Sequence, residues 1–141
     1  MTPAQRDEGL SDGERHAWGM RVRREVLSDA HVDAAITRTT PLTADFQDLI
    51  TRYAWGDIWS RPGLDRRSRS IAVLTALIAL GHHEELAMHL RAAVRNGLTV
   101  DEISEVILQS AIYCGVPAAN TAYRIATEVF VEEATDGGSA S

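Results

Sequence analysis

Three residues with acid–base side chains fall in one predicted helix, over residues 82–95. His82, Glu85 and His89 are spaced i, i+3 and i+7, so at about 100° per residue they share one helix face. Burying an acid or an imidazole costs several kcal/mol unless it is paired, so this placement needs a reason. The same face carries Leu86, Leu90 and Ala93, and the opposite face carries Glu84, Arg91 and Arg95.

Two interpretations of this pattern remain open. Glu85 and His89 can pair across one helical turn, and a carboxylate favours a helix N-terminus, so the pair could be purely structural. Alternatively, the pair performs acid–base chemistry, because imidazole titrates near neutral pH and a carboxylate can fix its tautomer. A metal site is disfavoured, since His82 and His89 lie about 10 Å apart along the helix axis.

The chain contains no lysine, so all 14 basic side chains are arginine. This excludes a lysine Schiff base, a pyridoxal-phosphate aldimine and a biotinyl-lysine. The remaining reactive groups are carboxylates, imidazoles, guanidinium groups, hydroxyls and one thiol. That thiol, Cys114, is in phase with Ile103 and Ile107, which predicts a buried and inert side chain.

Composition predicts an ordinary soluble domain. The 141 residues are 45% hydrophobic and 24% charged. A net charge of −6 argues against nucleic acid or an anionic membrane as a partner. A single cysteine and an N-terminus without an apolar signal segment predict a cytoplasmic location. We expect a domain over residues 11–134, flanked by disordered tails at 1–10 and 135–141.

Capping signals predict where the helices begin and end. Ser11 with Glu14, and Thr99 with Glu102, are capping-box signatures, and no long run alternates with the period of a strand. The pattern therefore predicts an all-α fold with short connections. The expected helices cover about 11–27, 29–39, 43–59, 66–80, 82–95, 99–114 and 117–133.

Two of these helices carry unusual faces. The helix at 43–59 has a main apolar stripe and, opposite it, Arg52, Trp55 and Trp59, which predict a subunit interface or a pocket wall. Residues 71–80 are apolar except for Thr75, which predicts a buried core helix too short to span a bilayer. Arginine side chains at the start of that helix oppose its dipole, which indicates an anionic group nearby. These arginines are Arg66, Arg67 and Arg69, and the main apolar stripe of the helix at 43–59 is Phe46, Leu49, Ile50 and Tyr53.

Residues 20–133 resemble the carboxymuconolactone decarboxylase family. The most specific matching stretches are TRYAWGDIWSRPGLDRRSRS at 51–70 and AIYCGVPAAN at 111–120. The resemblance implies a single-domain orthogonal bundle of about six to seven helices, like the alkylhydroperoxidase-D-like proteins. It also implies a homo-oligomer, either a trimer or a hexamer, and decarboxylation of 4-carboxymuconolactone to 3-oxoadipate enol-lactone in the protocatechuate branch of the β-ketoadipate pathway. No metal or other cofactor is implied.

The peroxidase-type relatives carry a CxxC pair before a histidine. In this chain the two cysteine positions are His82 and Glu85, the histidine is His89, and a further glutamate of those relatives falls at about Ser70. Disulfide-based peroxidase activity is therefore not expected. A redox protein that kept the fold and a non-catalytic helical module remain the alternatives.

The implied chemistry suggests a role for each candidate. His89, oriented by Glu85, would act as a general acid, and His82 would donate to the developing oxyanion. Arg52 and Arg69 would bind the two carboxylates of the dicarboxylate lactone, because guanidinium groups match carboxylates and a net-acidic protein needs local positive charge there.

Overall fold

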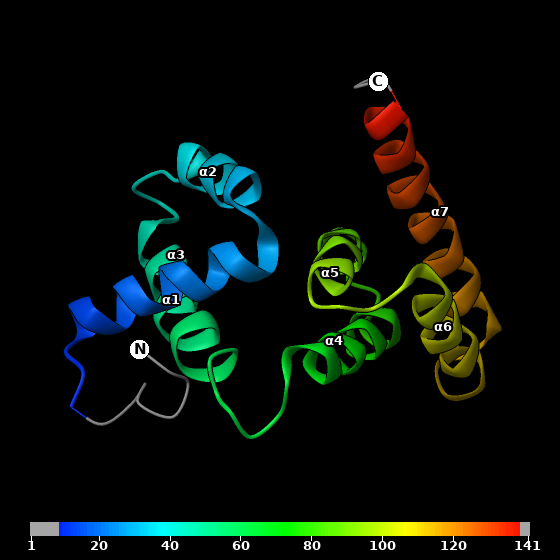
Figure 1. Ribbon diagram of the computed structural model, residues 1–141, viewed down its shortest axis with the longest axis horizontal. Helices are drawn as coiled ribbons and strands as arrows, with labels where there is room; N and C mark the ends of the chain where they lie inside the picture. Colours follow the sequence, from blue (N-terminus) through cyan, green and yellow to red (C-terminus); the bar gives the residue numbers. More distant parts are fainter. Residues whose placement is uncertain (1–8, 139–141) are drawn as a thin grey trace. The chain divides into compact units, whose positions relative to one another are not determined.

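The computed structural model describes residues 9–138, and within this range the chain forms helices and no strand. The predicted all-α class is confirmed. The chain divides into two compact units, Met1–Arg66 and Arg67–Ser141, and the expected domain at 11–134 spans both (Figure 1). Residues 1–8 and 139–141, which belong to the predicted tails, lie outside the described residues. Among the described helices, none has the length and apolarity needed to cross a membrane.

The first unit begins with a capped helix, as predicted. The side chain of Ser11 accepts a hydrogen bond from the backbone N–H of Glu14 at 3.2 Å. A sharp turn at Ser28, with φ of 91°, separates the first two helices, and the Ser28 hydroxyl caps the second by accepting from the His31 N–H. The elements are α1 (Asp12–Leu27), α2 (Asp29–Arg38), α3 (Ala44–Ile50) and the π-helix η2 (Thr51–Ile58).

Helix α1 crosses η2 at a very close approach of the two backbones. Gly19 of α1 faces the carbonyl oxygen of Thr51, and a Cβ atom at Gly19 would overlap that oxygen. On the other helix, a Cβ at Gly56 would lie 2.9 Å from the carbonyl oxygen of Arg15. The two glycines therefore let α1 and η2 touch backbone to backbone.

The predicted main stripe of the helix at 43–59 is wrong. Phe46, Leu49 and Tyr53 are 60%, 46% and 48% exposed, whereas Trp55 is buried and stacks on Trp59 with ring centroids 5.4 Å apart. Phe46 and Leu49 belong to α3, which is α-helical and has no buried residue. From Thr51 the chain winds as a π-helix, whose i→i+5 hydrogen bonds turn each residue through a smaller angle, so the stripe does not continue on the same face to Tyr53. The residues of η2 that face α1 include Thr51 and Gly56.

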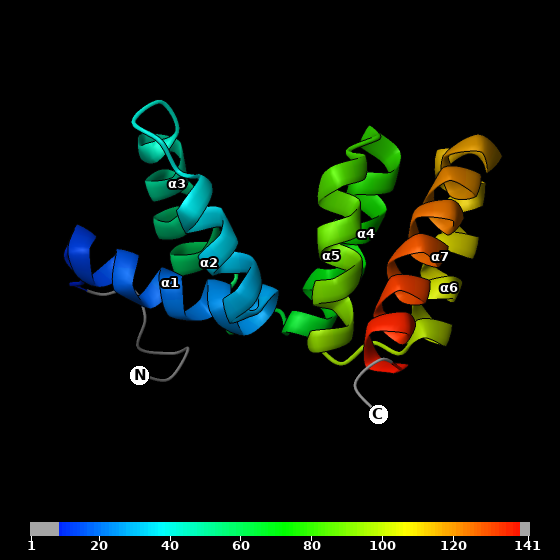
Figure 2. The ribbon, with the colours of Figure 1, turned by 90° about the horizontal axis from the view of Figure 1, so that it is seen from above.

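The second unit is a four-helix arrangement with one hydrophobic core. Helix α7 packs against both α5 and α6, and the four helices lie side by side in Figure 2. The predicted capping box of Thr99 and Glu102 is confirmed. Gly97 and Gly115, with φ of +102° and +100°, turn the chain after α5 and before α7. The elements are α4 (Arg66–Leu80), α5 (His83–Arg95), α6 (Val100–Cys114) and α7 (Val116–Gly138).

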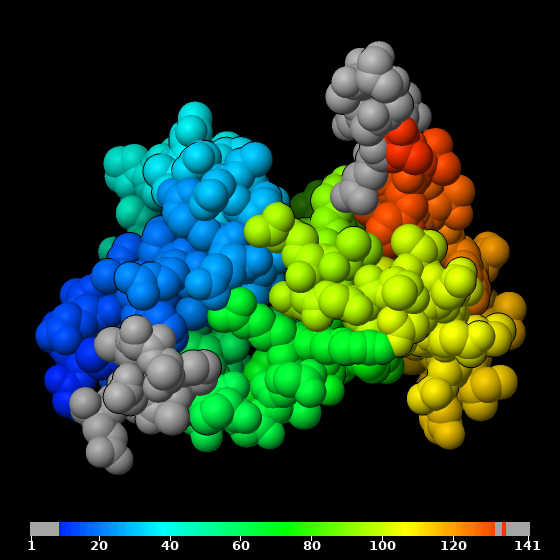
Figure 3. Space-filling model, in the orientation of Figure 1, coloured from blue at the N-terminus to red at the C-terminus, as the bar shows by residue number. Residues whose placement is uncertain are grey.

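The prediction that α4 is buried all round is wrong. Only Ser70, Leu74 and Ile78 are buried, whereas Ile71 is 38% and Leu80 69% exposed. The packed core covers one face of α4, so its other apolar side chains reach the surface. In Figure 3, α4 (green) and α6 (yellow) both form part of the visible surface.

Helix α7 continues beyond its expected end. Four side chains on its inner face are buried, and the helix runs on to Gly138. The first residues of the expected C-terminal tail are therefore helical. The four buried side chains are Ala122, Ile125, Ala126 and Val129.

Candidate functional site

His89 lies on the inner face of α5. The helix follows a turn at Gly81, whose φ of +72° favours glycine, and it begins at His83. Only 7% of His89 is exposed, so the prediction that its imidazole turns inward with the apolar face is confirmed. The buried residues of α5 are Leu86, His89, Leu90, Ala92 and Ala93.

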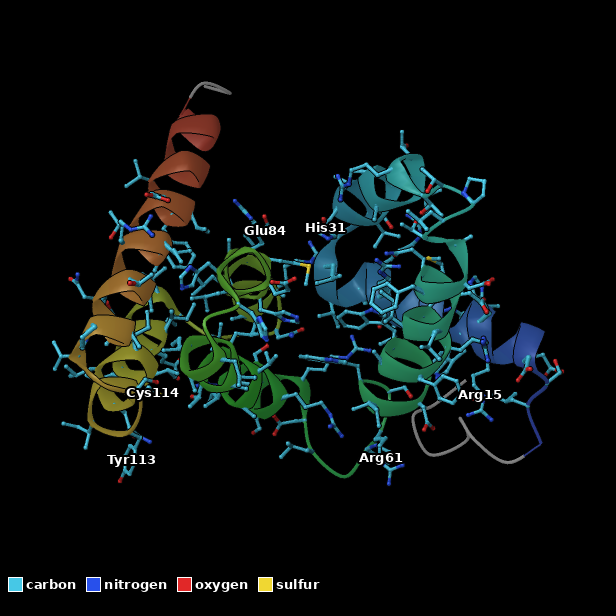
Figure 4. The ribbon with its side chains drawn as sticks, turned by 180° about the vertical axis from the view of Figure 1, so that it is seen from behind. Arg15, His31, Arg61, Glu84, Tyr113 and Cys114 are labelled. Atoms are coloured by element: carbon cyan, nitrogen blue, oxygen red, sulfur yellow. The ribbon has the colours of Figure 1, made fainter. Side chains whose placement is uncertain are left out.

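Glu85 and His82 differ from His89 in their surroundings. Both are exposed, so the prediction that they turn inward with His89 is wrong; Glu85 belongs to the first turn of α5 and His82 to its N-cap position, where the core does not cover them. Glu85 has no hydrogen-bond or ion-pair partner among the described residues, so the i, i+4 contact with His89 that the spacing allows is not made in this conformation. Figure 4 labels the neighbouring Glu84 on the outer side of α5, which is exposed as predicted.

The arginines at the start of α4 meet carboxylates of the protein itself. Arg66 pairs with Glu25 at 2.7 Å, and Arg67 pairs with Glu102. These two ion pairs explain why Arg66 and Arg67 are tolerated at a helix N-terminus without an external anion. Arg69 is half-buried one turn further along.

The residue after Arg69 ties two helices together. Ser70 is fully buried, and its hydroxyl oxygen accepts a hydrogen bond of 2.8 Å from Nδ2 of Asn96, at the end of α5. This bond satisfies a buried hydroxyl and fixes the end of α5 against the start of α4. Ser70 is therefore a structural contact at the position where the peroxidase-type relatives place a glutamate.

Arg52 belongs to the first unit, whereas Arg69 and the three α5 candidates belong to the second. Its Nε donates to Oδ2 of Asp48 at 2.9 Å, and this bond raises the pKa of the Arg52 guanidinium. The guanidinium also lies 5.3 Å from the centre of the Tyr53 ring. Arg52 is thus already engaged by a carboxylate one turn away.

Cys114 is half-buried against the core of the second unit, at the C-terminal end of α6, while the adjacent Tyr113 is exposed (Figure 4). Its contacts with core side chains agree with the predicted packing role, but the thiol is only partly buried and not fully buried as predicted, because Cys114 is the last residue of α6. Among the side chains that the structure describes, no group of three His, Cys, Asp or Glu is arranged to hold a metal ion.

Arg23 was not predicted as a site residue, yet among the described residues of the first unit it is the most buried charged side chain, at 6% exposed. A signal for it existed. Arg23 shares a helix face with Gly19, Val26 and Leu27 at i−4, i+3 and i+4, so an arginine sits within the inward stripe of α1.

Comparisons with known proteins now identify the family. Residues 44–128 match the carboxymuconolactone decarboxylase family. The chain is 46% identical, over 121 residues, to a 4-carboxymuconolactone decarboxylase of Acinetobacter baylyi, covering 86% of this chain and 90% of that protein. It is also 42% identical, over 120 residues, to a nitrosuccinic acid decarboxylase of Metarhizium robertsii, covering 85% of this chain and 83% of that protein. The chain belongs to the carboxymuconolactone decarboxylase family.

Proposed function

We propose that this protein is a carboxy-lyase that converts 4-carboxymuconolactone to 3-oxoadipate enol-lactone, without a cofactor, in the β-ketoadipate pathway. The observation that carries this proposal is the 46% identity over 86% of the chain to a protein of that activity. The burial of His89 among the apolar side chains of α5 supports it, because the reaction needs a proton donor.

The substrate itself supplies the electron sink. The carbon–carbon bond to the carboxylate on the ring carbon that bears the ring oxygen breaks, and carbon dioxide leaves. The electron pair moves through the ring C=C to the lactone carbonyl oxygen, giving a delocalised dienolate. A proton is then added to the ring carbon next to that carbonyl. The protein must therefore hold two carboxylates, stabilise an oxyanion and deliver one proton.

We assign these tasks to the candidate residues. His89 delivers the proton. Glu85 orients the imidazole of His89 once bound substrate excludes water from the first turn of α5. His82, or a backbone N–H at the start of α5, donates to the oxyanion, because the first N–H groups of a helix have no partner within it. Arg52 and Arg69 bind the carboxylates, and Arg52 would have to exchange Asp48 for the substrate.

Arg69 belongs to the same unit as His89, so it is the arginine with which to test carboxylate binding. Replacing Arg69 with glutamine is expected to raise KM about tenfold or more, since a charge-assisted hydrogen bond contributes about 1.5–3 kcal/mol. Initial rates over a range of lactone concentrations measure this. Arg38→Gln, an exposed arginine of α2, is the matched control. An unchanged KM in Arg69→Gln would remove Arg69 from the proposed site.

We also propose a cytoplasmic homo-oligomer, a trimer or a hexamer. The supporting observation is the apolar surface of α4 and α6, where Ile71, Leu108 and Ile112 line a groove of about 700 Å³. Ile112 is 80% exposed, and a second copy would remove this surface from water. The lone cysteine fits a reducing compartment.

Ile112→Glu is expected to dissociate the assembly, because it would place a charge in the buried contact. Light scattering after size-exclusion chromatography measures the mass, which we predict to be a multiple of 15.4 kDa for the wild type and smaller for the variant. Glu105→Gln, an exposed change on the same groove, is the control. A wild-type protein of 15.4 kDa would contradict the proposed assembly.

The activity itself is tested by an absorbance assay. The lactone is made in situ from 3-carboxymuconate by its cycloisomerase, and its disappearance is followed after this protein is added. Nitrosuccinate is the second substrate to assay, because a nitrosuccinic acid decarboxylase is 42% identical and a nitro group can also accept the electron pair left by carbon dioxide. No turnover of the lactone, with dithiol-dependent peroxide reduction instead, would favour the redox alternative.

A further inference from the structure

A buried guanidinium without a carboxylate partner lies in the first unit. Arg23 is 6% exposed, and burial lowers its pKa because the charged form loses hydration. Its Nη1 donates to Oγ1 of Thr51 at 3.3 Å, and its Nη2 donates to Oε1 of Gln47 at 3.1 Å. Its buried Nε has no hydrogen-bond partner among the described residues. Neutral acceptors do not balance a buried cation, so the positive charge of Arg23 remains uncompensated.

Arg23 lines a groove between α1, α2 and α3. The groove has a volume of about 480 Å³, which lies within the range of about 300–1,000 Å³ typical of small-molecule sites. Its wall combines apolar side chains, such as Met20 and Ile36, with the two neutral partners of Arg23. A small ligand could therefore place an apolar body in the groove and a polar end against Arg23.

The one carboxylate in the groove wall is already engaged. Asp48 accepts from Nε of Arg52 at 2.9 Å through one oxygen, and its other oxygen lies 3.5 Å from Nε2 of His16. Arg52 thus neutralises Asp48, and the surplus positive charge of the groove belongs to Arg23. One carboxylate group of a ligand, placed against Arg23, would balance this charge.

We propose that this groove binds a small carboxylate, with Arg23 as its principal contact. A guanidinium has five N–H donors; two are used by Thr51 and Gln47 and a third is on the buried Nε, which leaves one N–H on each of Nη1 and Nη2 for a ligand. The planar fork of these donors matches the two oxygens of a carboxylate. Thr51 and Gln47 hold the guanidinium in place, so little of its freedom is lost on binding.

The carboxylate could belong to two sources. One is the lactone substrate, and this reading rests on the proposed function. The other is a separate small carboxylate that binds the first unit alone. Arg23 lies outside the residues 44–128 that match the family, so neither source follows from that match.

The site is tested on the wild-type protein by titration with succinate, using the neutral succinamide as a control. Arginine Nε–H groups give separate NMR signals, and a buried Nε–H exchanges slowly with water. We expect one arginine Nε–H signal to shift saturably with succinate and to stay in place with succinamide. We expect that signal to be missing from Arg23→Lys, and contacts of the signal with Thr51 and Gln47 identify it even if this variant does not fold.

Affinity provides the matched comparison. Arg23→Gln is expected to weaken succinate binding about 10-fold to 100-fold by calorimetry, the loss typical of a charge-assisted hydrogen bond. Arg21→Gln, an exposed change on the same helix, should bind as the wild type does. The proposal is overturned if no arginine signal moves, if succinamide moves it equally, or if the moving signal persists in Arg23→Lys.

Inhibition kinetics separate the two sources. Succinate that competes with the lactone in the wild type, and no longer does so in Arg23→Gln, assigns the groove to the substrate. Succinate that binds without competing assigns it to a separate carboxylate. A wild-type protein that does not turn over the lactone would refute the proposed function, while the NMR titration would still decide the carboxylate site.

Discussion

Replacing His89 with glutamine is expected to lower kcat for decarboxylation about 100-fold to 10,000-fold, the usual contribution of a general acid. His89 is the buried acid–base group of α5, and glutamine can fill a similar space but cannot deliver a proton at neutral pH. KM should change little, because the proton is needed in the transition state and not for binding. Steady-state rates for the two proteins measure the effect, and circular dichroism checks that the variant is folded.

Glu85 and Glu84 form a matched pair for the orienting role. Both are exposed carboxylates in the first turn of α5, but only Glu85 is four residues before His89. Glu85→Gln should therefore lower kcat and alter its pH profile, and Glu84→Gln should leave both unchanged. Equal behaviour of the two variants would show that Glu85 acts only on the helix terminus.

Replacing Gly19 with alanine is expected to give the largest loss of stability of any single methyl addition in the first unit. The new Cβ would overlap the carbonyl oxygen of Thr51 and lie 3.0 Å from the backbone nitrogen of Gly56. Because these neighbours are backbone atoms, α1 and η2 must move apart. We expect a loss of about 3 kcal/mol in the free energy of unfolding, or about 10 °C in Tm.

Gly13 provides the control on the same helix. A Cβ there would meet only the side chain of Ser11, at 4.0 Å, and alanine is a better helix former than glycine. Gly13→Ala should thus leave Tm unchanged or raise it slightly. Thermal unfolding followed by circular dichroism compares the two variants, and a Gly19→Ala protein as stable as the wild type would show that α1 does not cross η2 this closely.

Much of the fold could be predicted because its signals are local. The capping box at Thr99 and Glu102 and the cap at Ser11 each act within one turn of backbone, and the structure contains them. The α-helical spacing also predicted that His89 turns inward, but it did not predict that Glu85 and His82 stay exposed at the start of α5. Such features depend on hydrogen bonds and side-chain spacing between residues that are three or four positions apart in the sequence.

Features that depend on distant partners could not be predicted in this way. No described part of the chain packs over α3 closely enough to bury Phe46, and the π-helix at Thr51–Ile58 changes the angular period, so the predicted stripe does not continue on one face to Tyr53. The exposure of α4 depends on how many other helices pack against it, and this number cannot be read from the sequence of α4 alone. The uncompensated charge of Arg23 likewise becomes visible only once the partners of its guanidinium are known.

The most direct test of the central claim is a side-by-side measurement of carbon dioxide and enol-lactone formation by the wild type and by His89→Gln, in buffer containing a metal chelator. We predict that the wild type releases one carbon dioxide for each enol-lactone formed, at a rate that the chelator does not change, and that the variant forms both products at least 100-fold more slowly. Full turnover by His89→Gln, or no turnover by the wild type, would contradict this account.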